Sequence, residues 1–142
     1  MTDSLTASEI VLIRDSFDRV SVGLRFSRNY YARLFDIAPE LRALFPDDLS
    51  IQLRKLMEML AALVEKLDRP HELMLALEAL GAQHRDYGVA PAHFAPVGQA
   101  LFETLQGELG PAFDDATRRA WIALYALCAT WMQQSFPRER RA

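Results

Sequence analysis

The stretch that decides the fold is residues 77–89, which read LEALGAQHRDYGV. Leu77, Leu80 and His84 follow one another at helical spacing, so the histidine lies on the same face of the predicted helix as the leucines. Gly88 is expected to close this helix. An imidazole on an apolar face needs a partner for each ring nitrogen. Taken alone, this histidine is better explained by hydrogen bonding within a core than by metal binding.

The composition is that of an ordinary globular protein. At 142 residues the chain is expected to form one domain, residues 1–142, with a full hydrophobic core. Hydrophobic residues make up 51% and charged residues 25%, which fits this class. The net charge of -3 gives no electrostatic support for nucleic-acid binding. The basic run is confined to the tail, at Arg138, Arg140 and Arg141.

Cysteine usage and the absence of targeting signals point to the cytoplasm. Cys128 is the single cysteine, which excludes an intramolecular disulfide and is compatible with a reducing compartment. Its place in an apolar helix is typical of a small buried hydrophobe. Residues 1–4 are polar and acidic, unlike a signal peptide. No apolar run approaches the roughly 20 residues that span a bilayer, so we expect no membrane insertion.

Hydrophobic periodicity predicts helices throughout the chain and no strands. Thr6 and Glu9 form a capping box before the first helix, and Ser50 is expected to cap the third long one. Prolines and glycines separate the segments. The predicted helices cover residues 7–20, 23–36, 39–45, 50–67, 71–87 and 91–109, and a last one runs from Asp114 or Asp115 to 135. Such helices can pack as an up-down bundle or in a crossed arrangement, and periodicity does not choose between these.

Three groups of residues distinguish between these two arrangements. Residues 31–41 read YARLFDIAPEL and are followed by Leu44 and Phe45. Residues 80–94 read LGAQHRDYGVAPAHF and are followed by Val97 and Gly98. The third group is Ala120, Trp121 and Tyr125.

In this order and spacing the chain resembles the globin family over nearly its whole length. It is most similar to bacterial single-domain globins, whose short second interhelical loop is matched here because Phe45 and Gln52 lie only seven positions apart. The resemblance implies an all-α globin fold, with crossed helices around a haem pocket. It also implies haem b as the cofactor.

On the proximal side, the resemblance implies that His84 is the metal ligand and binds the haem iron through Nε2. Its Nδ1–H is expected to donate to the backbone carbonyl of Leu80, four residues back, which would fix the tautomer. His71 and His93 match no ligand position. We expect His71 to be exposed after its helix-breaking proline, and His93 to face solvent from the first turn of its helix.

On the distal side, the resemblance places Gln52 where many globins carry a histidine, with Leu56 one turn on and Tyr31 opposite on the second helix. A phenol O–H and a carboxamide N–H are donors that stabilise partial negative charge on bound O2 in a dry pocket. Two alternatives remain open: Tyr31 as an ordinary core aromatic, and Gln52 as an exposed residue that swings into solvent. Tyr30 competes for the distal role, although the register favours Tyr31.

Further residues are expected to surround the cofactor. Phe45 should stack on the porphyrin, and the proximal side should be lined by Leu80, Val89, Phe94 and Val97. These residues could equally be plain core, because a globin core is built around its haem. Lys55 and Arg85 are candidates to pair with the propionates, but a solvated charge is the simpler account of either.

The chain departs from the flavohaemoglobin pattern at two positions. Those proteins support the proximal histidine with a tyrosine ten residues later and a glutamate on the last helix, where this chain has Phe94 and Phe136. Neither side chain can polarise His84. The sequence also ends where a flavin reductase domain would begin, so turnover is expected to need an external reductase.

Two functions of different classes therefore remain. The favoured one is a haem protein that binds O2 as a carrier, scavenger or store, and that also accepts CO and NO. The alternative is a nitric oxide dioxygenase that uses an external reductase. A haem-based gas sensor acting through a partner is a third reading. A monomer or weak homodimer is expected.

Overall fold

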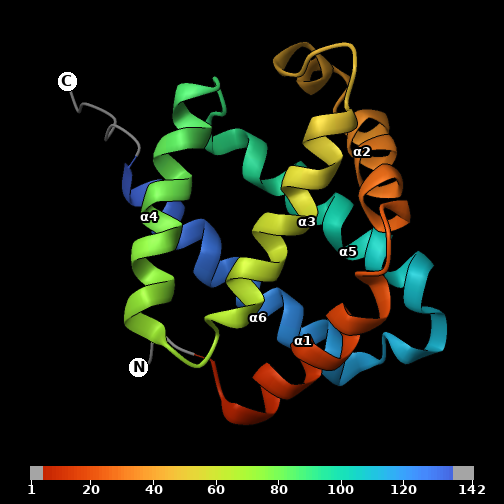
Figure 1. Cartoon of the computed structure of the whole chain (residues 1–142), viewed down its shortest axis with the longest axis vertical. Coiled ribbons are helices and arrows are strands. Elements are labelled where there is room, and N and C mark those ends of the chain that lie inside the picture. Colours follow the sequence, from red (N-terminus) through yellow and green to blue (C-terminus); the bar gives the residue numbers. More distant parts are fainter. Residues whose placement is uncertain (1–4, 136–142) are drawn as a thin grey trace.

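The computed structural model describes residues 5–135, and that part of the chain is helical without strands, as predicted (Figure 1). The main helices are α1 (Ala7–Val20), α2 (Arg25–Ile37), α3 (Ser50–Glu65), α4 (Pro70–Asp86), α5 (Phe94–Leu109) and α6 (Asp115–Met132). Short 3-10 segments join or extend them: η1 (Pro39–Leu44), η2 (Pro91–His93), η3 (Gly110–Ala112) and η4 (Gln133–Ser135). Predicted and observed ends agree to within a few residues.

Two of the predicted helix caps are confirmed and one is wrong. The Thr6 side chain accepts from Glu9 N and the Glu9 side chain from Thr6 N, which completes the capping box. Asp114 accepts from Thr117 N at 2.9 Å and caps α6. Ser50 does not cap α3 as predicted. Instead Asp48 Oδ1 accepts from both the backbone N (2.9 Å) and the hydroxyl (2.6 Å) of Ser50, because a carboxylate two residues earlier is the stronger acceptor.

The core is built where α1, α4 and α5 pack on α6. Trp121 is 1% exposed, and its indole N–H donates to Ser16 Oγ on α1 at 2.8 Å. This bond satisfies the polar end of the largest buried side chain. Cys128 is buried on the same helix, and burial raises the pKa of its thiol to about 12. It therefore behaves as the expected small hydrophobe and not as a reactive thiol.

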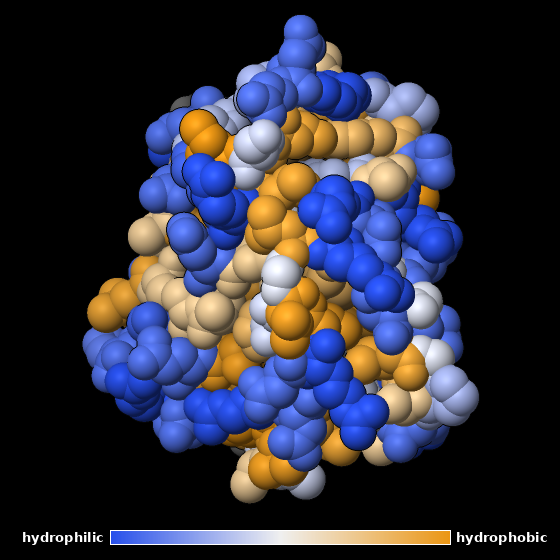
Figure 2. Space-filling model, turned by 45° about the vertical axis from the view of Figure 1, so that its right-hand side comes forward, coloured by the Kyte–Doolittle hydropathy of each residue, from blue (hydrophilic) through white to orange (hydrophobic). Residues whose placement is uncertain are grey.

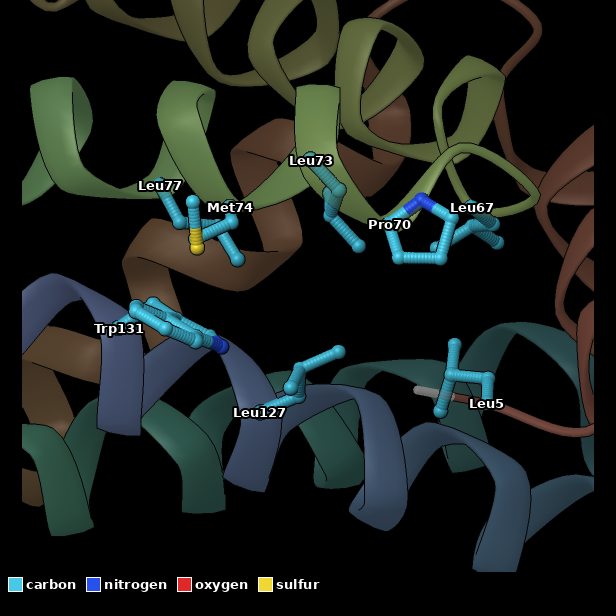
Figure 3. Close-up of a pocket in the computed structure, with 8 residues that line it drawn as sticks. All are labelled: Leu5, Leu67, Pro70, Leu73, Met74, Leu77, Leu127 and Trp131. Atoms are coloured by element: carbon cyan, nitrogen blue, oxygen red, sulfur yellow. The ribbon is translucent and has the colours of Figure 1, made fainter. Parts of the chain in front are cut away.

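The two helices that carry the candidate site residues are splayed apart. Helices α3 and α4 follow each other through residues 66–69 and diverge from that connection (Figure 1). They are not among the pairs of elements that pack extensively, whereas α2 packs on α5 and α4 on α6. A small apolar pocket lies between the first half of α4 and α6, where Leu73 and Leu77 point toward Leu127 (Figure 3).

Apolar side chains also reach the surface. Figure 2 shows one face on which they form a band between hydrophilic margins. Ile51 and Tyr87 are each 61% exposed, and they neighbour the ends of α3 and α4 that carry the predicted site. Within residues 5–135, no helix combines the length and apolarity needed to cross a bilayer.

Candidate functional site

His84 lies near the end of α4 in a fixed orientation. Its Nδ1 is 2.8 Å from the backbone carbonyl of Leu80, as predicted. A carbonyl oxygen can only accept, so Nδ1 carries a proton, and in this tautomer the lone pair lies on Nε2. The side chain is half-buried. Because Nδ1 is bonded to the backbone of α4, Nε2 is the ring nitrogen of His84 that a ligand could take.

The position of α4 depends on a close approach to α6 at Gly81, three residues before His84. A Cβ at Gly81 would lie 2.7 Å from Met132 Cα and would also collide with Met132 O. Only a glycine allows the two backbones to come this close. The contact fixes the depth and rotation of the helical turn that carries His84.

Gln52 and Tyr31 form a hydrogen-bonded pair between α3 and α2. The Gln52 carboxamide N–H donates to Tyr31 Oη at 3.0 Å. Tyr31 is 5% exposed and Gln52 half-buried, so the glutamine turns inward and not into solvent. Burial raises the pKa of the Tyr31 phenol, and the bond from Gln52 opposes part of the rise. Because the phenolic oxygen accepts from Gln52, the phenol proton is available to another acceptor.

Tyr30 is buried beside this pair without replacing Tyr31 in it. Its ring meets the Tyr31 ring edge-on, with centroids 5.1 Å apart. Burial raises the pKa of Tyr30 well above its usual value, and the neighbouring Tyr31 and Tyr125 add to the rise. Gln52 bonds Tyr31 and not Tyr30, which agrees with the register derived from the sequence.

A second hydrogen bond fixes α3 against α2 next to this pair. Ser27 is fully buried one turn before Tyr31, and its hydroxyl donates to the Leu53 carbonyl at 2.8 Å. The two bonds occupy successive turns of α2 and adjacent residues of α3, so together they set how the helices cross. Ser27 was not singled out from the sequence, because its only signal is a small polar residue on a buried helical face.

The predicted lining residues divide between two apolar clusters. Phe45, Leu56 and Val97 pack around Tyr31 and Leu34 in one of them. The other, around Trp121, contains Phe94 and receives Leu80 and Val89. Leu101 contacts both clusters. Leu80, Val89 and Phe94 therefore lie in one cluster as a group, whereas Val97, which was predicted with them, packs in the cluster of Tyr31 because it lies on the part of α5 that meets α2.

The other residues singled out from the sequence are mostly exposed where the structure describes them. Lys55 is exposed, and Arg85 is exposed beside Asp86 at 3.4 Å. His71 is exposed, as expected. His93 differs from expectation: it is half-buried, because its Nδ1 accepts from Ala90 N at 2.9 Å and so holds the ring over the turn before α5. Phe136 lies outside the described residues.

A tyrosine on α6 bonds the residue that lies ten positions after His84. Phe94 is buried at the tenth position after His84, and its backbone carbonyl accepts from the Tyr125 hydroxyl. Gly98 makes room for that tyrosine, since a Cβ there would lie 2.6 Å from the Tyr125 ring. Tyr125 thus fixes the start of α5, where Phe94 and Val97 lie.

This donor set fits an iron porphyrin better than a bare metal ion. Within residues 5–135, no three His, Cys, Asp or Glu side chains gather in a way that could hold a metal. Porphyrin iron needs a single protein ligand and an apolar slot for its ring. His84 offers the nitrogen, and the half-buried Leu56, Leu80 and Val97 offer apolar surface on α3, α4 and α5.

Comparisons with known proteins show which family this chain is similar to. The family model described as Globin matches residues 28–132. Neuroglobin from Danio rerio is 31% identical over 149 residues, covering 94% of this chain and 94% of that protein. The flavohemoprotein of Vibrio cholerae is 32% identical over 130 residues, which cover 88% of this chain and 33% of that protein.

A solved structure supports the predicted crossed arrangement. The hexacoordinated heme protein from an anhydrobiotic tardigrade, at pH 4, has a TM-score of 0.81 at 20% sequence identity. The match covers 93% of this chain and 95% of that one. At this identity the likeness concerns the fold alone, and it favours the crossed arrangement of helices over an up-down bundle.

Proposed function

The chain belongs to the globin family, and from this premise we propose that it is a haem b protein that binds O2 reversibly. Two observations support the proposal: an imidazole on α4 whose Nδ1 is held by the Leu80 carbonyl, and a buried Tyr31–Gln52 hydrogen bond between α2 and α3. The matched relatives include fish neuroglobins and part of a bacterial flavohaemoprotein. The narrower likeness to bacterial single-domain globins remains a prediction.

The residues that would hold the porphyrin come from four elements. His84 on α4 would bind the iron, and its bond to Leu80 keeps the ring from rotating. Leu56 on α3 and Val97 on α5 offer apolar surface, and Phe45 offers an aromatic ring. Haem, when bound, supplies an iron centre that binds diatomic gases.

The distal pair would select and retain a polar ligand. The Tyr31 phenol lies among apolar side chains, where a hydrogen bond gains strength from the low local dielectric. Gln52 holds the phenolic oxygen from the other side and orients that proton. A hydrogen bond to an acceptor that carries charge contributes about 1.5–3 kcal/mol, so O2 would be retained longer than an apolar gas.

The proximal chemistry favours O2 binding over nitric oxide dioxygenation. Nδ1 of His84 donates to a neutral backbone carbonyl, which draws the imidazole proton less strongly than a carboxylate would. Phe94 adds no polar side chain at the position that the sequence comparison singled out. Sustained NO consumption would in addition need a reductase that returns the ferric iron to the ferrous state.

Absorbance spectroscopy of the reduced protein tests this proposal. We expect a five-coordinate deoxy spectrum, since Gln52 takes the place of a distal histidine and is bonded to Tyr31. O2 should then bind reversibly, and NO turnover with a cellular reductase should be slow. A six-coordinate low-spin deoxy spectrum, or oxidation at once in air, would contradict the proposal. Rapid, reductase-driven NO consumption would favour the dioxygenase.

A further inference from the structure

The loop between η1 and α3 is wrapped around one arginine. Nη1 of Arg42 donates to the carbonyls of Phe45 (3.3 Å) and Pro46 (2.9 Å), and Nη2 donates to the carbonyl of Asp47 (3.0 Å). Three successive carbonyls therefore converge on one guanidinium. The backbone N of Phe45 also donates to the Arg42 carbonyl at 3.1 Å, so the turn closes on this residue from both sides.

This loop conformation needs a cation at its centre. Carbonyl dipoles that point to a common spot repel one another, and a planar guanidinium with several fixed donors offsets that repulsion. Pro46 has no N–H to give the loop another backbone bond. The next fixed point is Asp48, which bonds Ser50 at the start of α3. Without Arg42, residues 45–47 would lose the donors that hold them in place.

The same arginine contacts the aromatic side chains beside the distal pair. Its Cζ lies 5.3 Å from the centroid of the Phe35 ring, a cation–π distance. Phe35 and Phe45 meet edge-on at 5.4 Å, and Phe45 meets Tyr31 at 5.4 Å. Three aromatic rings contact Tyr31: those of Tyr30, Phe35 and Phe45. Arg42 binds two of these residues, Phe45 through its backbone carbonyl and Phe35 through its ring.

We propose that Arg42 is a positioning residue that holds residues 45–47, and with them the Phe45 ring, in the wall of the ligand pocket. The part of this inference that concerns haem rests on the proposed function. Arg42 touches neither of the distal donors, so it acts through Phe45 and Phe35. Its contribution should be visible in the loop itself and in how firmly the pocket retains its cofactor.

The opposite end of α3 offers a matched control. Arg14 on α1 donates through Nε to the Val64 carbonyl (3.3 Å) and through Nη2 to the Glu65 carbonyl (3.1 Å) and to Asp68 (3.1 Å). It makes the same kind of guanidinium-to-carbonyl contacts, but where α3 ends. Arg14→Gln should therefore cost stability of the same order as Arg42→Gln and leave the pocket wall unchanged.

The test compares Arg42→Gln, Arg42→Lys and Arg14→Gln in the full chain as purified. Hydrogen exchange of the amides of residues 43–50 reports on the loop, and transfer of hemin to an excess of an apo-globin acceptor reports on the pocket. We expect Arg42→Gln to speed exchange in the loop about tenfold and hemin loss about fivefold, with Arg14→Gln changing neither. Arg42→Lys should resemble Arg42→Gln, because an ammonium cannot serve three carbonyls through a fixed fork.

Unchanged exchange in Arg42→Gln would overturn the proposal. So would faster exchange without faster hemin loss, or an equal effect of Arg14→Gln on hemin loss. If the wild-type chain takes up no hemin, the proposed function fails, and the exchange comparison alone then decides whether Arg42 holds the loop.

Discussion

At the scale of single residues, Tyr31 and Gln52 differ in how available each is as a hydrogen-bond donor to a bound ligand. The glutamine donates to the phenolic oxygen at 3.0 Å, so one of its N–H groups is already used within the protein. The phenol proton has no such commitment to Gln52, and the rigid ring loses little entropy in presenting it. Tyr31 is therefore the main donor toward a ligand, and Gln52 is first of all its positioning partner.

Tyr31→Phe should raise the O2 dissociation rate about tenfold to a hundredfold, the range expected for losing one hydrogen bond to a charged acceptor. Gln52→Leu should raise it less, because the phenol remains. The double variant should be non-additive, since the two side chains are in contact. Stopped-flow measurement of O2 release gives these rates.

CO dissociation is the control for that series. CO carries much less charge on its terminal oxygen, so its rate should change far less in either variant. If O2 release from Tyr31→Phe equalled the wild-type rate, the phenol would not reach the ligand, and Tyr30 would become the candidate donor.

The inward turn of Gln52 is a detail that the sequence could not supply. Its direction depends on how α3 crosses α2, and this crossing is fixed by the Ser27–Leu53 bond between residues 26 positions apart. By contrast, the His84–Leu80 bond is local to one helix, so its geometry follows from spacing alone. Local contacts were predictable here, and contacts across helices were not.

At the scale of helices, the same distinction holds. The period of apolar residues predicted α1 with both of its ends, because a capping box marks the start. The predicted Ser50 cap at the start of α3 is wrong, because the Ser50 hydroxyl donates back to Asp48 and only the loop conformation decides this. The divergence of α3 from α4 has no local signal, because it results from the packing of both helices on other elements.

Gly81→Ala tests how α4 is placed. The added methyl group would meet the Met132 backbone, so α4 must move away from α6, at a cost of about 1–3 kcal/mol in the free energy of unfolding. The shift would also displace His84 and speed hemin loss. Chemical denaturation and hemin transfer measure the two effects.

Gly107→Ala is the matched control for that substitution. Gly107 lies in the helical part of α5, and a Cβ there would meet no atom within 4 Å. Alanine should stabilise the protein by about 0.5–1 kcal/mol, because it reduces the entropy of the unfolded chain. If both variants behaved alike, close packing at Gly81 would not be what places α4.

At the scale of the whole molecule, two buried tyrosines, Tyr30 and Tyr31, and the half-buried Tyr125 link stability to alkaline pH. Burial raises the pKa of Tyr30, Tyr31 and Tyr125 in the folded protein. In the unfolded chain these phenols ionise near pH 10. The folded state therefore binds more protons than the unfolded state above that pH, and stability must fall as pH rises.

Denaturant unfolding between pH 8 and 11 checks this linkage. The free energy of unfolding should be flat up to about pH 9.5 and should decline beyond it, as expected for phenols whose folded-state pKa lies above about 10. Tyr30→Phe should make the decline shallower. A free energy that stayed constant to pH 11 would contradict the burial of these phenols in the native state.

The central claim is that the imidazole of His84 is the protein ligand of the haem iron. Hemin titration of the wild type and of His84→Gly, followed by Soret absorbance, tests it most directly. The account predicts one haem per wild-type chain, loss of firm binding in the variant and recovery with added imidazole. His71→Ala and His93→Ala should bind as the wild type does. An unchanged Soret band and full stoichiometry in His84→Gly without imidazole would contradict the account.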